Sequence, residues 1–172
     1  MTNSALLLSA LLAVAPATGA PQSASAYQQP GERIEGDRDT EAAILAVVLA
    51  FYKPAGRQSR WIDNERLPSS ASGVPADGLD AQSVDALVTR LGEGRFCPGA
   101  ERHRCRSDVG GRLRVSAVYR TDDSHARVAV LFENAWPGAP RVASTQVFHL
   151  VREVKSRGWR IAGRAPASEQ AP

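Results

Sequence analysis

Three histidines are the side chains best suited to proton transfer or metal binding near neutral pH. His103 lies among arginines, where we expect it to face water, and His125 follows two aspartates at the start of a predicted strand, which favours a turn contact. His149 alternates with Val147 and Val151, so its side chain points to the same side of a strand as theirs. Whether that side lines a pocket or forms the outer face is left open by the pattern, and His149 is a candidate ligand-binding residue.

Carboxylates are not arranged in a recognisable catalytic pattern. Asp63 and Glu65 fall in an irregular segment, and Asp122 and Asp123 fall in a turn, so we expect all four to be solvated. Glu133 lies on a strand, where a surface ion pair explains it. The sequence has no nucleophile elbow, phosphate loop, dinucleotide-binding glycine pattern or zinc-protease helix. We therefore assign no catalytic residue, no cofactor and no metal ligand.

The two cysteines, Cys97 and Cys105, are separated by a short segment that contains Pro98 and Gly99, so the chain can turn back between them. We predict a disulfide, which would stabilise the fold by about 2.5 kcal/mol in the chain-entropy model. A metal site is the competing interpretation, but two thiols need further ligands, and His103 is the obvious one nearby.

Aromatic residues supply further candidates for ligand binding. Tyr52, Trp61, Trp136 and Trp159 could line a cavity, because ligand pockets are mostly apolar with a few polar contacts. Each of them also fits ordinary core packing. Together with His149, we take Tyr52, Trp61 and Trp159 as the candidate ligand-binding residues.

The N-terminal segment is typical of an export signal. Residues 1–26 contain no charged side chain, and Ala5–Val14 is an almost unbroken apolar run. Small residues allow cleavage after Ala20 or after Ala26, and the second matches the usual pattern directly. The apolar run is well short of the roughly 20 residues that span a bilayer. We therefore expect a signal peptide over 1–26, no transmembrane anchor after cleavage, and a periplasmic or secreted protein.

The rest of the chain divides into three parts. Residues 27–36 are polar and contain Pro and Gly, which predicts a flexible linker. Residues 37–165 have the length of a single domain. Residues 166–172 show no pattern and are expected to form a disordered tail.

Two helices are expected at the start of this domain. Asp37 or Asp39 can cap the first, in which 42–52 is apolar at every position before Pro54 and Gly56 end it. A helix that is apolar all round is buried on most sides.

The second helix follows an irregular connection over 58–78. Asp80 can cap it, apolar residues recur at helical spacing from Val84 to Leu91, and Gly92 is placed to end it.

Alternation of apolar and polar residues predicts strands after residue 110. The strands are expected near 111–119, 126–132, 142–154 and 159–161. Helices followed by antiparallel strands predict an α+β fold, with two or three N-terminal helices packed on a curved antiparallel sheet of about four strands.

This layout resembles the nuclear transport factor 2-like superfamily, a cystatin-like α+β cone. The likeness rests on the buried helix that ends in Phe51-Tyr52, the long alternating strands and the closing Gly158–Ile161. It implies that a curved sheet wraps around the first helix. The superfamily includes ketosteroid isomerase-like and polyketide cyclase-like enzymes as well as many non-catalytic proteins, so it implies no catalytic residue here. Segments such as Gly94–Cys97 and Phe148–Glu153 are also similar to uncharacterised exported bacterial proteins.

Charge does not favour nucleic acid as a partner. The net charge is +3, but 18 acidic residues are interspersed with the basic ones along the chain. The densest basic cluster, Arg102–Arg106, is best explained as a solvated loop. The sequence therefore favours an exported, non-enzymatic module that binds a small apolar ligand or a protein partner. The alternatives are an isomerase- or cyclase-type enzyme with a cone-shaped pocket, and a structural envelope or dimerisation protein, for which a homodimer is the assembly considered.

Overall fold

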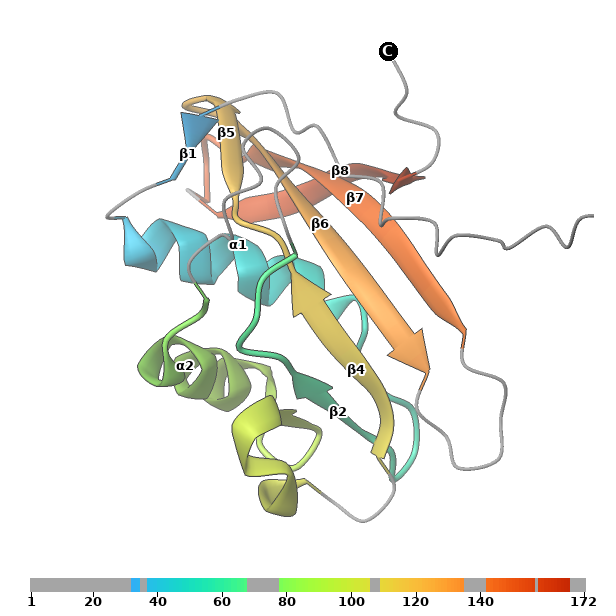
Figure 1. The fold of residues 1–172 in the computed structure, drawn as a ribbon. Coiled ribbons are helices and arrows are strands. Elements are labelled where there is room, and N and C mark those ends of the chain that lie inside the picture. The colour runs from blue at the N-terminus through green and yellow to red at the C-terminus, as the bar shows by residue number, and fades with distance from the viewer. Residues whose placement is uncertain are drawn as a thin grey trace, which may run out of the picture.

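The computed structural model describes residues 32–34, 37–67, 78–105, 109–134, 142–156 and 158–167. Two α-helices lie on the same side of one mixed, mostly antiparallel sheet (Figure 1). The predicted α+β class is confirmed. The sheet is larger than the four strands expected, because eight strands join it within the described residues.

Helix α1 (Arg38–Ala50) begins where the sequence placed it. The side chain of Asp37 accepts a hydrogen bond of 3.0 Å from the Thr40 amide and so caps the first turn. Ile44, Leu45, Val48 and Leu49 are buried against the sheet and the second helix. The helix is therefore enclosed on most sides, as its apolar sequence predicted.

Helix α2 (Ala81–Leu91) also has the predicted caps. Asp80 accepts a hydrogen bond of 2.8 Å from the Ser83 amide at the start. Gly92 ends the helix with a φ of 111°, a backbone conformation that residues other than glycine rarely adopt. Its apolar stripe, which includes Val84 and Leu87, packs into the same core as α1.

The sheet is centred on its longest antiparallel strands. In chain order the strands are β1 (Glu32–Arg33), β2 (Ser59–Ile62), β3 (Phe96–Pro98), β4 (Val109–Val115), β5 (Tyr119–Asp122), β6 (His125–Asn134), β7 (Ala143–Arg152) and β8 (Trp159–Pro166). Strand β6 pairs with β7 along one edge and with both β4 and β5 along the other, and β7 then pairs with β8. The helices cover the inner face of this sheet, and the opposite face is called the outer face below.

A break at Ser116 divides the single strand that alternation predicted near 111–119. The Ser116 hydroxyl accepts a hydrogen bond of 2.9 Å from the Ala129 amide, a position that a strand carbonyl would otherwise fill. The Ser116 amide donates to the Ala129 carbonyl at 2.9 Å. The chain can therefore bulge between β4 and β5 while both strands stay paired with β6.

Several features of the sheet were not expected. Strand β2 lies in the segment 58–78 that was predicted to be irregular, and it pairs in parallel with both β3 and β4, so the sheet is not wholly antiparallel. Strand β1 lies within the predicted linker 27–36 and pairs with β5. Strand β8 reaches Pro166, the first residue of the predicted tail, and residues 168–172 lie outside the described part of the chain.

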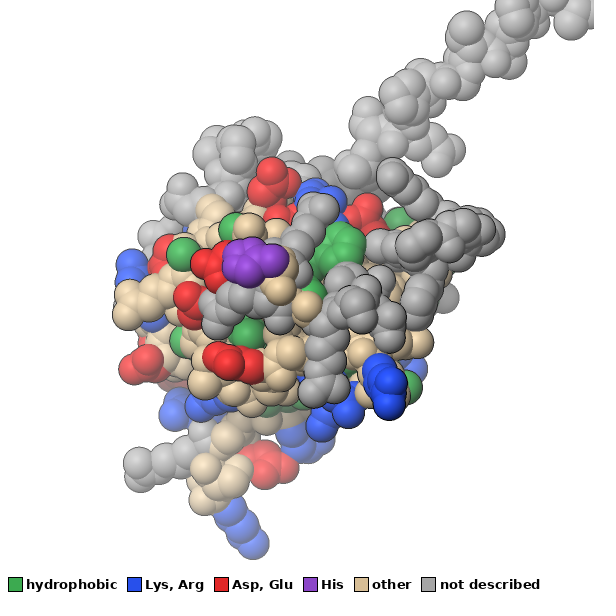
Figure 2. Space-filling model, turned by 90° about the horizontal axis from the view of Figure 1, so that it is seen from below, with side chains coloured by type: hydrophobic (Ala, Val, Ile, Leu, Met, Phe, Trp, Pro, Cys, Tyr) green, Lys and Arg blue, Asp and Glu red, His purple; other side chains and the backbone are tan. Residues whose placement is uncertain are grey.

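No helix in the described ranges is long and apolar enough to cross a membrane. The predicted signal peptide, residues 1–26, lies outside those ranges. Acidic and basic side chains are both spread over the face seen in Figure 2, in keeping with the mixed charge pattern of the sequence.

Candidate functional site

A groove lies between α1, the end of α2 and the hairpin that joins β7 to β8. Its volume is about 540 Å³, within the range of sites that hold small organic ligands. We call it the helix–hairpin groove. It is lined by Asp39, Thr40, Ala43, Ala46, Val47, Ala50, Arg90, Leu91, Arg152, Gly158 and Trp159.

The floor of the helix–hairpin groove follows from the spacing of small residues on α1. Ala43, Ala46 and Ala50 lie three and four positions apart, so their methyl groups share one face of the helix. Larger side chains there would fill the space between α1 and the hairpin. Trp159, the first residue of β8, forms the facing wall.

The charged lining of the groove combines two cations with one acid. Arg90 comes from the last turn of α2 and Arg152 from the end of β7, while Asp39 lies in the first turn of α1. Between them the surface is mostly apolar. The groove can therefore hold an apolar molecule, and a negatively charged group on that molecule could contact either arginine.

The four residues predicted to bind ligand do not come together. Trp159 lines the helix–hairpin groove, whereas Tyr52 lies just after α1 in a group of aromatic rings on the inner face. Trp61 lies on β2 near Gly99 at the disulfide loop. His149 lies opposite Arg127 on the outer face. Trp136, also considered, lies outside the described residues.

His149 belongs to the sheet face that the helices do not cover. Its neighbour Phe148 is buried in the main core, and alternation therefore places His149 on the opposite side. Burial and the adjacent charge of Arg127 hold the pKa of His149 below its ordinary value. The side chain is separated by the sheet from the helix–hairpin groove.

His125 makes the turn contact that the sequence indicated. Its Nδ1 lies 2.8 Å from an Asp122 carboxylate oxygen and 2.9 Å from the Ser124 hydroxyl. A serine, histidine and aspartate relay needs the hydroxyl and the carboxylate on opposite ring nitrogens. Here both contact the same nitrogen, so the three residues form a turn and not a catalytic relay. The hydrogen bond from His125 and those from Ser124 lower the pKa of Asp122.

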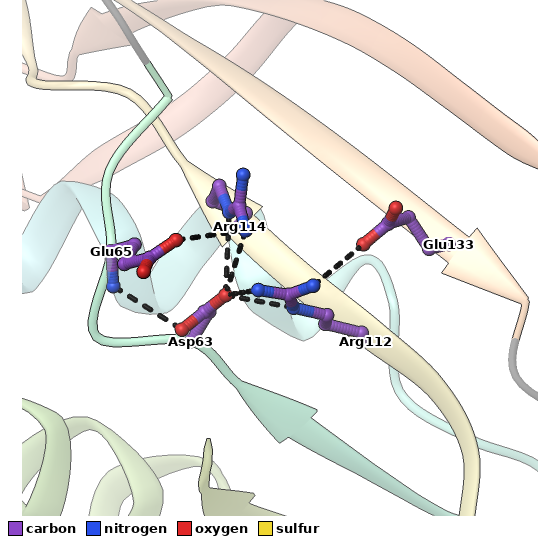
Figure 3. Close-up of polar contacts among 5 residues, drawn as sticks. All are labelled: Asp63, Glu65, Arg112, Arg114 and Glu133. Carbon is purple, nitrogen blue, oxygen red and sulfur yellow. Dashed lines mark hydrogen bonds and ion pairs between the residues drawn. The ribbon is translucent and has the colours of Figure 1, made fainter. Parts of the chain in front are cut away.

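A charge network occupies the outer face where β2 ends (Figure 3). Asp63 accepts hydrogen bonds from Arg112 and Arg114, Arg114 also contacts Glu65 at 3.0 Å, and Arg112 contacts Glu133 at 3.4 Å. Glu65 is exposed as expected, but the Asp63 side chain is only 14% exposed, so the prediction that it is solvated was wrong. The charged groups of the network pair with one another, and the network is best explained as a contact that holds neighbouring strands together.

Burial alone would raise the pKa of Asp63. The hydrogen bonds from Arg112 and from the Glu65 amide outweigh burial, and the pKa of this carboxyl lies below its ordinary value. Asp63 is therefore ionised at neutral pH and is a poor candidate for a general acid.

The predicted disulfide is confirmed between Cys97 on β3 and Cys105, the residue that follows the 3₁₀ segment Gly99–Arg104, with their Cα atoms 5.5 Å apart. Among the described residues, no group of three or more histidine, cysteine or acidic side chains is placed to hold a metal ion. The side chains of Arg102 and Arg104 lie outside the described part of the chain, as does Arg106.

Sequence reasoning missed most of the groove. Its floor had a signal, since alanines recur at helical spacing inside an apolar run, but small core residues give the same pattern. No sequence signal pointed to the arginines. Arg90 and Arg152 are far apart in the sequence, and they line the same groove only because α2 and the hairpin pack beside α1.

No protein-family model, curated protein or solved structure matches this chain.

Proposed function

We propose that this chain is an exported, non-enzymatic module that binds a small apolar ligand in the helix–hairpin groove. The observation that carries the proposal is the groove of about 540 Å³, which has an alanine-lined floor on one side and Trp159 on the other. An apolar ligand that replaces water there gains roughly 25 cal/mol for each Å² of apolar surface it buries.

Export is supported by the uncharged, apolar leader and by the Cys97–Cys105 disulfide, since disulfides persist in oxidising compartments. Membership of the nuclear transport factor 2-like superfamily is part of the proposal. It is supported by the way α1 packs on the inner face of a mostly antiparallel sheet.

The test uses the mature, oxidised protein and anilinonaphthalene sulfonate, a fluorescent probe with an apolar body and an anionic group. We expect saturable binding, with energy transfer from Trp159 to the probe. Substitution Ala43→Phe places a ring in the groove and should weaken probe binding about tenfold, which corresponds to about 1.4 kcal/mol.

The matched control is Ala86→Phe, which adds the same ring at an exposed position of α2 outside the groove. It should leave probe binding unchanged. Equal affinity of the probe for both variants, or no saturable binding to the parent protein, would contradict the proposed site. A far-ultraviolet circular dichroism spectrum and an unfolding curve for each variant show that any loss is not a failure to fold.

A further inference from the structure

A second group of residues, separate from the helix–hairpin groove, lies just beyond the end of α1. It consists of aromatic rings from α1's C-terminal turn and strands β6 and β7, with an arginine from β2 and another from β8. We call it the aromatic–arginine cluster. Its members are Phe51, Tyr52, Arg60, Phe132, Phe148 and Arg164.

The rings form a continuous apolar surface. The Tyr52 ring stacks on Phe132 with centroids 5.9 Å apart and meets Phe148 edge-on at 5.9 Å. Phe51 contacts both Tyr52 and Phe148, and Phe51 is 48% exposed. The surface is therefore buried at Tyr52 and open to solvent at Phe51.

The buried hydroxyl of Tyr52 has no hydrogen-bond acceptor within the described part of the chain. Tyr52 is 7% exposed, and its oxygen has no hydrogen-bond partner among the described residues. Leaving a buried polar group unsatisfied costs about 1–3 kcal/mol, and such groups in native proteins call for an explanation. Burial raises the pKa of Tyr52 to about 12 although the charges of Arg164 and Arg60 oppose the rise, so the hydroxyl keeps its proton at neutral pH.

Both arginines lie over the faces of aromatic rings. The guanidinium of Arg60 lies 4.6 Å from the centroid of Phe132, and that of Arg164 lies 4.5 Å from the centroid of Phe51. A cation–π contact of this kind does not itself use the N–H groups of a guanidinium, which can still donate hydrogen bonds to an anion.

The donors of the two arginines are largely unused. The buried Nε of Arg60 has no acceptor among the residues that the structure describes, and Arg164 donates one hydrogen bond of 3.3 Å to the amide oxygen of Gln146. Neither guanidinium forms an ion pair with a carboxylate in the part of the chain that the structure describes. The cluster thus combines two positive charges and a neutral hydroxyl donor with no acid of its own.

We propose that the aromatic–arginine cluster binds a small aromatic carboxylate, whose anionic group accepts hydrogen bonds from Tyr52, Arg60 and Arg164. A carboxylate is the acceptor whose planar geometry matches a guanidinium edge. An aromatic body matches the ring surface of the cluster. Access is through the exposed Arg164 and Phe51, so the ligand exchanges the Arg164 contact with Gln146 for one with its carboxylate.

The experiment titrates benzoate into the mature protein by isothermal calorimetry, with benzamide as the uncharged probe of the same shape. We expect saturable benzoate binding, and we expect benzamide to bind with an affinity at least tenfold lower. Tyr52→Phe and Arg164→Gln should each weaken benzoate binding at least fivefold. Arg160→Gln, on the same strand but paired with Glu153 at 3.1 Å, is the matched control and should bind benzoate as the parent does.

A second readout does not depend on the ligand. Because Tyr52→Phe removes an unsatisfied buried hydroxyl, the free protein should unfold at the same denaturant concentration as the parent or at a higher one. A lower midpoint would mean that the hydroxyl has a partner inside the protein and would overturn the proposal. So would absent benzoate binding, or binding that Tyr52→Phe leaves unchanged. The groove variant Ala43→Phe should keep benzoate binding, which separates failure of this site from failure of the helix–hairpin groove.

Discussion

The Ser116 hydroxyl takes the place of a backbone carbonyl in the ladder between two strands. It accepts from the Ala129 amide at 2.9 Å and donates to the Ala117 carbonyl at 2.7 Å, and Ser116 is only 5% exposed. Few other side chains are short enough to reach back to the ladder and also able to accept a hydrogen bond. The bulge between β4 and β5 therefore depends on this one residue.

We expect Ser116→Ala to lower the free energy of unfolding by about 1–3 kcal/mol, since the buried Ala129 amide loses its acceptor. Urea unfolding followed by circular dichroism measures the change. Ser144→Ala, at an exposed position of β7, is the control and should fall within about 0.5 kcal/mol of the parent. A cost no larger than that of the control would mean that water or another group satisfies the amide.

Gly111 provides the space in which Phe132 lies. A Cβ added at position 111 would overlap the Phe132 ring, whereas one added at Gly163 would meet nothing within 4 Å. Phe132 in turn carries the Arg60 guanidinium on its face. The absence of a side chain on β4 therefore helps to position the aromatic–arginine cluster.

Gly111→Ala should destabilise the protein by about 1–3 kcal/mol, because the added methyl group displaces a packed ring. It should also weaken benzoate binding if that binding occurs at the cluster. Gly163→Ala is the matched control, and we expect its unfolding midpoint in urea to stay close to the parent's. Equal midpoints for the two variants would show that Phe132 moves aside without cost.

At the scale of elements, the helices could be predicted from local sequence signals. The strands could be predicted only in part, because some of them form through pairing with distant segments. The caps at Asp37 and Asp80 are read from a few neighbouring residues, and both are present. Strand β2 is short and contains Arg60, and its partners β3 and β4 lie far along the chain, so no local pattern marks it as a strand.

The same limit applies to the candidate site residues. Alternation shows that His149 and Phe148 point to opposite faces of β7, but it does not show which face the helices cover. The side chain of Arg60 reaches Phe132 of β6 across the intervening strand β4, and that of Arg164 reaches Phe51 at the end of α1. The role of these two arginines can be recognised only once the pairing of the strands is known.

The charge network around Asp63 joins β2 to β4 and, through Arg112 and Glu133, to β6. Because the pKa of Asp63 is lower in the folded protein than its ordinary value of 3.8, ionised Asp63 stabilises the fold above that value. The stabilisation is lost as pH falls through the folded-state pKa.

Asp63→Asn should therefore reduce stability at neutral pH and flatten the fall in stability at acid pH. Urea unfolding midpoints, measured from about pH 6 down to about pH 2, test this expectation. Glu65→Gln, which alters the 74% exposed member of the network, is the control and should change the midpoint at neutral pH less. If the unfolding midpoint of Asp63→Asn falls at acid pH as steeply as that of the parent, other carboxyl groups cause the acid sensitivity.

On the scale of the whole molecule, a buried ion pair links three parts of the fold that are distant in sequence. Arg66, in the segment after β2, contacts Glu41 of α1 at 2.9 Å and donates to the Ser116 carbonyl at 3.1 Å. Its side chain is 5% exposed and that of Glu41 is 18% exposed. The contact therefore fixes the first helix against the point where the sheet bulges.

Glu41→Gln leaves the Arg66 charge buried and without its counter-charge, which should cost about 3 kcal/mol of unfolding free energy. Replacing both residues, with Glu41→Leu and Arg66→Met, removes the unpaired charge and should recover most of that loss, less about 1 kcal/mol for the Ser116 carbonyl left without its donor. Urea unfolding of both variants measures the difference. The control Arg38→Gln alters an ion pair of 3.9 Å whose arginine is 77% exposed, so it should change stability by less than about 1 kcal/mol. If Glu41→Gln costs no more than Arg38→Gln, water reaches Arg66, and the link between α1 and the bulge rests on apolar packing alone.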